Sequence, residues 1–214
     1  MYRVLIPIMG FVETFQLNGV YIKTTVTSRQ KDVDDILWSF LRPANYNGPK
    51  VIGFDVELSM YEDKVSEEET RDDSECATLH LCNGISCLIV QLCHLDSIPT
   101  SLLNFLRLPD YTFVGVGINH NLVKLEKDYG IRCRNAVELG PLAATLKKLP
   151  RLGFCGVDEL AFAVNKLDLG NYRPLTTLYK NWGQSNFGKK LAKLATVNVY
   201  SYYMIGNTLL SADS

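Results

Sequence analysis

The hydrophobic positions of this chain follow two periods, and each period predicts one kind of element. Runs that are β-branched or continuously apolar predict strands at 20–27, 50–57, 77–82, 87–92 and 111–117. The third and fourth runs are separated by Asn83-Gly84, a pair that is typical of a hairpin turn. We expect residues 1–12 to form a strand and a loop, because Pro7 interrupts a stretch that would otherwise resemble a signal peptide.

Helical spacing of the apolar residues predicts helices at 32–41, 99–106 and 120–129, and a long final helix at 189–210. Asn119 is expected to cap the third helix, and Gly130 to end it. A strand meander followed by alternating strands and helices predicts an α/β (α+β) fold, with a mixed central sheet flanked by helices. The 214 residues suffice for a single domain over 1–214, since no internal repeat divides them.

Composition and charge describe an ordinary globular protein and favour no particular partner. Hydrophobic residues make up 47% of the chain and charged residues 21%. The formal net charge of −1 gives no overall attraction to nucleic acid or to an anionic membrane. Because the sequence holds no run of about 20 apolar residues, we expect no membrane partner and an intracellular protein, either nuclear or cytoplasmic.

Four of the six cysteines lie close together in strand-like segments, at Cys76, Cys82, Cys87 and Cys93. Their spacing matches no CxxC zinc or redox motif. A zinc site that also uses His80 or His94 is one interpretation. Buried, reduced thiols of an intracellular protein are the interpretation that we prefer.

Two carboxylates end the apolar strand at 50–57. Asp55 and Glu57 are separated by one residue, so their side chains point to the same face of a strand. Two acids at a buried strand end can share a divalent cation. A strand that simply leaves the core at Glu57 has the same pattern, so the pair alone does not decide between the two interpretations.

Three sequence blocks resemble the motifs of the DEDD superfamily of 3′–5′ exonucleases. Residues 112–118, followed by Asn121, Lys124-Leu125 and Asp128-Tyr129-Gly130, are similar to the second motif of plant Werner-syndrome-like exonucleases. Residues 77–92 resemble the strands after the first motif, and Trp182 with residues 194–202 resembles the third motif. The resemblance covers about residues 20–210 and implies a ribonuclease H-like fold.

The resemblance also implies hydrolysis of the terminal phosphodiester at a nucleic-acid 3′ end. Members of the superfamily hold two ions, usually Mg²⁺ or Mn²⁺, with four acids, and a Tyr or His positions the attacking water. Here Asp55 and Glu57 match the first motif, but the other two acid positions hold Asn121 and Asn198. Leu194 stands where the Tyr is expected. We therefore expect a weakly bound Mg²⁺ or Mn²⁺ on the two remaining acids, or no metal.

No neighbouring residue replaces the missing groups. Asp128 lies seven residues beyond Asn121, about 10 Å along a helix axis, which is too far for a metal ligand. Lys193 stands where a related variant of the motif carries a His. His120 adjoins Asn121, but neighbouring side chains of a helix diverge by about 100°, so we expect His120 at the surface.

Charge is distributed unevenly along the chain. Residues 62–75 hold eight acids and two bases, a net charge of −6, which leaves +5 for the remainder. An acidic segment near the first motif opposes phosphate binding and favours a basic protein partner. Basic clusters occur at Lys147, Lys148 and Arg151, and at Lys189, Lys190 and Lys193; each is a candidate for phosphate contacts or a solvated face. Tyr200, Tyr202 and Tyr203 are candidates for stacking on bases, although we prefer helix packing.

Three functional hypotheses follow from these residues. The first is an exonuclease-fold protein, catalytically impaired or inactive, that binds nucleic acid (DNA or RNA) or regulates a protein partner. The second is a weak metal-dependent 3′–5′ exonuclease that uses Asp55 and Glu57. The third is a homo-oligomeric protein-interaction module.

Overall fold

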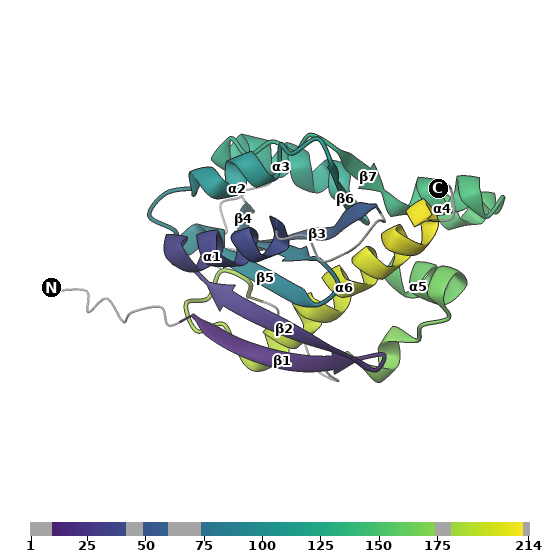
Figure 1. The fold of residues 1–214 in the computed structure, drawn as a ribbon, viewed down its shortest axis with the longest axis horizontal. Coiled ribbons are helices and arrows are strands. Elements are labelled where there is room, and N and C mark those ends of the chain that lie inside the picture. Colours follow the sequence, from purple (N-terminus) through teal and green to yellow (C-terminus); the bar gives the residue numbers. More distant parts are fainter. Residues whose placement is uncertain (1–9, 42–48, 60–73, 174–180, 212–214) are drawn as a thin grey trace, which may run out of the picture.

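The computed structural model describes residues 10–41, 49–59, 74–173 and 181–211, and within them the chain forms a seven-stranded mixed sheet (Figure 1). The strands are β1 Phe11–Leu17, β2 Val20–Thr27, β3 Lys50–Ser59, β4 Glu75–Cys82, β5 Ser86–Gln91, β6 Tyr111–Gly115 and β7 Ala136–Glu138. Their order across the sheet is β1-β2-β5-β4-β3-β6-β7. Strand β3 pairs antiparallel with β4 and parallel with β6, so both kinds of pairing meet at β3.

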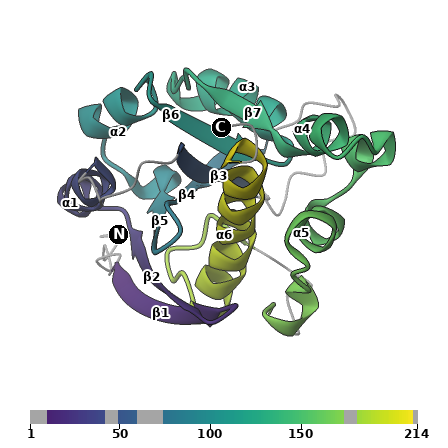
Figure 2. The same cartoon turned by 45° about the vertical axis from the view of Figure 1, so that its right-hand side comes forward.

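Helices cover both faces of the sheet. The first face carries α1 Gln30–Leu41, α2 Thr100–Phe105 and α3 Ile118–Tyr129, and the second carries α4 Leu139–Leu146, α5 Val157–Asn165 and α6 Lys189–Ser211. Three short 3-10 helices connect these elements: η1 Leu92–His94, η2 Pro150–Phe154 and η3 Leu169–Asn171. Figure 2 shows α6 against the sheet, with α4 and α5 beside it. The fold is therefore three-layered, with a hydrophobic core on each side of the sheet.

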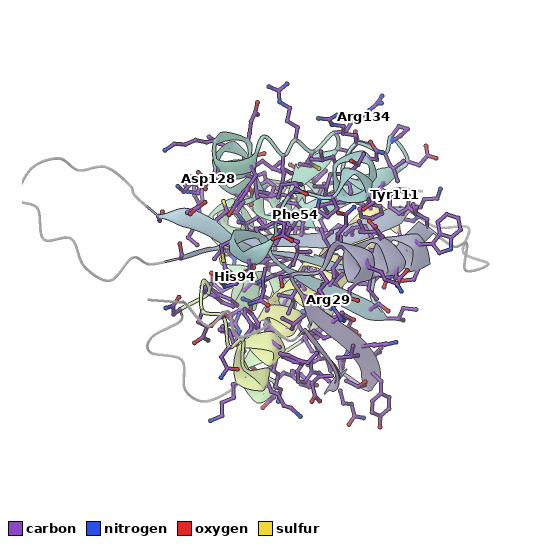
Figure 3. All side chains as sticks on the ribbon, turned by 90° about the vertical axis from the view of Figure 1, so that its left-hand side faces the viewer. Arg29, Phe54, His94, Tyr111, Asp128 and Arg134 are labelled. Carbon is purple, nitrogen blue, oxygen red and sulfur yellow. The ribbon has the colours of Figure 1, made fainter. Side chains whose placement is uncertain are left out.

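Alternating side chains of β3 divide between the two cores. Phe54 lies in the middle of the molecule, in the core under α1 to α3, whereas Val51 belongs to the core under α6 (Figure 3). Gly53 faces α6 as well, and a Cβ added to it would lie 2.0 Å from the carbonyl oxygen of Val199. Because successive side chains of a strand alternate, Asp55 also points to the α6 face.

The strands and helices predicted from periodicity are confirmed, with shifts at their ends. The predicted cap Asn119 is wrong, because Gly117 takes the N-cap position with a left-handed φ of 72° and Asn119 falls inside the first turn. Gly130 does end the helix, with φ of 67°. The strand and loop expected over residues 1–12 fall mainly on residues 1–9, which lie outside the described residues; β1 begins at Phe11 and continues to Leu17, beyond the expected range. Most of the acidic segment 62–75 also lies outside them.

The six cysteines are free thiols in this structure. Burial raises the pKa of the Cys82 thiol to about 12 and that of Cys87 well above its ordinary value. His80 is fully buried and bonds to Thr78 Oγ1 at 2.8 Å, whereas His94 bonds to the carbonyl oxygen of Gly183. Within the described ranges, no three His, Cys, Asp or Glu side chains converge as metal ligands.

Among the described residues, every helix is too short or too polar to span a bilayer.

Candidate functional site

Asp55 and Glu57 lie on the face of β3 that is turned towards α6. Asp55 is 6% exposed, and Glu57 is half-buried. The Asp55 Oδ1 atom accepts a hydrogen bond from the backbone N–H of Val56 at 3.0 Å. The parallel pairing of β3 with β6 ends at Gly53, so Asp55 extends beyond β6, where the chain turns into α3. This edge of the sheet brings the other motif positions towards Asp55.

Asn121 lies in the first turn of α3 and reaches Asp55. Its Nδ2 atom donates to Asp55 Oδ1 over 3.4 Å, a long hydrogen bond. The start of the helix is fixed by Gly117, whose backbone N–H donates to Glu138 Oε1 at 2.7 Å. The second-motif position is therefore beside the first-motif carboxylate, as the resemblance requires, but it presents an N–H donor to that carboxylate.

Asn198, on α6, faces a cation of the protein itself. Its Oδ1 atom accepts a hydrogen bond from Arg173 Nη2 at 2.9 Å. The same guanidinium is anchored by Asp158, in the first turn of α5, because Nη1 contacts the two carboxylate oxygens at 2.8 and 2.6 Å. Arg173 Nε is buried and has no hydrogen-bond partner among the described residues. The amide at the third-motif position is thus held by a guanidinium.

Tyr202 lies one helical turn beyond Asn198 and is buried. Its pKa is raised well above the ordinary value, first by burial and then by the negative charges of Asp55 and Glu57, while Arg173 acts in the opposite direction. The Tyr202 phenol therefore stays neutral, and it lies near the charged side chains of Asp55, Glu57 and Arg173. Helix packing, the interpretation preferred from sequence, agrees with this burial.

Leu194 lies one turn before Asn198, and its side chain is 4% exposed. An apolar side chain offers no hydrogen bond with which to orient a water molecule. The basic cluster predicted on this helix consists of Lys189, Lys190 and Lys193. Lys189 forms an ion pair with Glu13 of β1 and lies nine residues from Asn198, about 14 Å along the helix axis. One of its three charges is therefore already offset by an acid.

Asp128 and His120 lie outside the site. Asp128 accepts a hydrogen bond from the backbone N–H of Cys76 at 2.9 Å and lies 3.7 Å from Lys124 Nζ. Figure 3 shows Asp128 away from Phe54, the neighbour of Asp55 in β3. His120 is exposed on α3. Asp128 thus fixes the start of β4 and supplies no charge to the motif positions.

The four motif positions do not fit a two-metal centre. Two divalent cations roughly 3.5–4 Å apart need several anionic oxygen ligands around them. These four positions supply two carboxylates, Asp55 and Glu57, and two amides. Of the amides, Asn121 turns its NH₂ group towards Asp55, and Asn198 is bound by a guanidinium. This donor set offers a pair of divalent cations too few anionic oxygens at the motif positions.

Two residues of the site were not found from the sequence. Glu138 ends the three-residue strand β7 next to the start of α3; a short apolar run that ends in an acid, as β3 does, is the signal for it. Arg173 is 25 residues from Asn198, and no local pattern marks it. Only the path of the chain through η3 brings its guanidinium to α6.

Comparison with known proteins finds similarity to an exonuclease in sequence and to exonuclease domains in fold. No protein-family model matches it. It is 28% identical over 166 residues to the protein RISC-interacting clearing 3′-5′ exoribonuclease 1 of Arabidopsis thaliana, covering 77% of this chain and 78% of that protein. The catalytic core of RRP6 from Trypanosoma brucei superposes with a TM-score of 0.67 and 13% identity, covering 93% of this chain, which spans only 49% of that core. The EXO domain of Aedes aegypti Nibbler gives a TM-score of 0.67 and 10% identity, covering 92% and 90% of the two chains.

The fold is that of the DEDD-type 3′–5′ exonucleases, a ribonuclease H-like architecture with a mixed seven-stranded sheet and flanking helices.

Proposed function

We propose that this protein is a catalytically impaired or inactive exonuclease-fold protein that binds nucleic acid and acts in a regulatory role through that binding. The observation that carries the proposal is the state of the two amides: Asn121 donates to Asp55, and Asn198 is bound by Arg173. The Arabidopsis relative is by its name an exoribonuclease that interacts with RISC, which supports single-stranded RNA as the first ligand to test.

The magnitude of the expected defect follows from what the site lacks. Removing one charge-stabilising group from a preorganised active site typically costs about 10²–10³ in rate. At the motif positions, two carboxylates and the water-positioning Tyr are replaced, by Asn121, Asn198 and Leu194. Losses within one site are not additive, but a defect of several orders of magnitude is expected.

A restoration experiment tests this proposal. Asn121→Asp, Asn198→Asp and Leu194→Tyr together return the motif residues. We expect little activity from this triple variant, because the new carboxylate at position 198 will pair with Arg173 instead of a metal ion. Adding Arg173→Gln removes the competing cation. This variant with four substitutions, called the fourfold variant, should shorten a labelled single-stranded RNA in the presence of Mn²⁺.

The matched control is Asp55→Ala in each background, which should abolish any gain. Equal cleavage by the triple and fourfold variants would contradict the role given to Arg173. Vigorous Mn²⁺-dependent cleavage by the unmodified protein, lost with Asp55→Ala, would contradict the proposal itself.

The second candidate is a weak exonuclease with one cation bound by Asp55 and Glu57, and it is favoured by their shared face on β3. Calorimetric titration of the protein with Mn²⁺ tests it, with Glu57→Gln as the comparison. Millimolar binding that is lost in the variant would support this candidate, whereas no binding at millimolar Mn²⁺ would reject it.

A further inference from the structure

Two exposed aromatic rings with basic neighbours lie on η2 and α5. Phe154, the last residue of η2, is 95% exposed, and Phe162 on α5 is 60% exposed. Lys166 Nζ lies 5.6 Å from the centre of the Phe162 ring. Arg151 is exposed three residues before Phe154. We call these four residues the aromatic-basic surface.

The exposure of Phe154 is unusual within this chain. The other phenylalanines, apart from Phe162, are buried or half-buried in the described structure. An exposed ring forgoes the hydrophobic free energy that its burial would provide. A large apolar side chain that is kept in water beside charged residues is typical of a binding surface.

One packing contact and one stretch of sequence connect the segment around Phe154 to the candidate site. The chain just before it packs on the start of α4, where a Cβ added to Gly140 would lie 3.0 Å from the carbonyl oxygen of Gly153. Gly140 follows Glu138 closely in the chain, and Glu138 bonds to the start of α3. In the other direction along the chain, Phe154 is four residues before Asp158, which anchors Arg173. Along the chain, Phe154 therefore lies between a residue that packs on α4 and a residue that anchors Arg173.

The charges near Phe154 favour an anionic partner. Lys147, Lys148 and Arg151 are exposed, and none of them forms an ion pair within the described residues. Two acids lie near the ring, on the first turn of α5. Asp158 is offset by Arg173, which leaves Glu159 as the acid that opposes three bases. This basic excess contrasts with the Lys189 end of α6, where Glu13 offsets a charge.

We infer that the aromatic-basic surface binds single-stranded nucleic acid, with unpaired bases stacked on Phe154 and Phe162 and phosphates contacted by Arg151 and Lys166. Aromatic rings accept any base, and neighbouring cations follow the phosphate backbone. The inference rests on the proposed nucleic-acid binding and adds where the strand lies: over η2 and α5. A duplex hides its base faces, so unpaired strands are the expected ligands.

The test is fluorescence anisotropy of labelled oligouridine and oligothymidine strands with the full chain. Phe154→Ala should weaken binding by about 5- to 100-fold, as expected for one lost base–aromatic stack. Phe154→Trp keeps a stacking ring and should bind within about threefold of the unmodified protein. Trp38→Ala is the matched control, because Trp38 is an exposed aromatic residue, 62% exposed, on α1 across the sheet.

The salt dependence of the same binding tests the basic part of the surface. Arg151→Gln should lower the slope of log Kd against log salt concentration by about 0.7, the value for one phosphate contact on a single strand. Lys31→Gln changes an exposed cation on α1 and should leave that slope unchanged. An unchanged slope in the Arg151 variant would contradict the inferred contact between Arg151 and a phosphate.

Three further outcomes separate the inference from the proposed function. Strong binding of single strands that Phe154→Ala does not weaken would overturn the inference and leave the proposed nucleic-acid binding intact. No binding of either strand by the unmodified protein would contradict both. An oligomer, seen by light scattering, that dissociates with Phe154→Ala would identify the surface as a subunit interface and also overturn the inference.

Discussion

At the residue scale, Asn121 and Asn198 have nearly the shape of the aspartates that the motifs require, but they carry no charge. An amide of this shape fits the same space in the fold, whereas a divalent cation prefers the charged oxygen of a carboxylate. Both positions could be identified from sequence, because the surrounding motif is local. The contact of Asn198 with Arg173 could not, because the two residues meet only after η3 and α6 have packed.

A buried histidine makes the stability of the protein depend on pH. His80 is fully buried against Trp182, and burial lowers its pKa to about 3 from an ordinary value of 6.5. Between pH 6.5 and 3 the unfolded chain carries a proton on this ring and the folded chain does not, so folding loses about 1.4 kcal/mol per pH unit as the pH falls. Urea unfolding at pH 6.5 and 4.5 should show a loss of about 2 kcal/mol from this residue, because the unfolded ring is already half protonated at pH 6.5.

Replacing the ring separates this contribution from that of the carboxylates. His80→Phe should lower stability at pH 6.5, because Thr78 loses its partner, but should reduce the difference between the two pH values. His120→Gln alters an exposed histidine and should keep the full difference. An undiminished difference in the His80 variant would show that this ring is not the buried neutral group described above.

At the element scale, the site depends on how closely α6 crosses β3. Strands with continuous apolar runs were predictable from sequence, as was α6, because each carries a strong periodic signal. Strand β7 was not predicted, because Ala136–Glu138 is only three half-buried residues long. Its pairing with β6 defines it as a strand, and that pairing exists only in the folded protein. The close crossing of α6 over β3 could not be predicted from the sequence either, because a glycine within a strand does not reveal which element packs on it.

Gly53 offers a direct test of this crossing. An added Cβ would lie 2.0 Å from the carbonyl oxygen of Val199 and 2.9 Å from the backbone nitrogen of Tyr203, so α6 would have to shift. We expect Gly53→Ala to destabilise the fold by about 2–3 kcal/mol, as overpacked cores do. Gly188→Ala, where nothing lies within 4 Å of the added carbon, should stay within about 0.5 kcal/mol of the original stability. Equal urea midpoints for the two variants would argue against the close crossing.

At the scale of the whole molecule, the net charge of −1 conceals an uneven distribution. The acidic segment 62–75 follows the strand that carries Asp55, whereas Arg151 and its basic neighbours lie on the α4 to α5 side. The sequence identified the fold class because three motif blocks occur in the right order over most of the chain. It could not choose between the two basic clusters, because their ion pairs, such as Lys189 with Glu13, exist only in the folded protein.

The exonuclease fold is retained here, and we propose that it lacks effective metal-dependent cleavage. The most direct measurement is the length of a 5′-labelled single-stranded RNA after incubation with the unmodified protein and millimolar Mn²⁺, with Asp55→Ala alongside. We expect the RNA to stay at full length with both proteins. Stepwise shortening from the 3′ end by the unmodified protein, absent with Asp55→Ala, would contradict it.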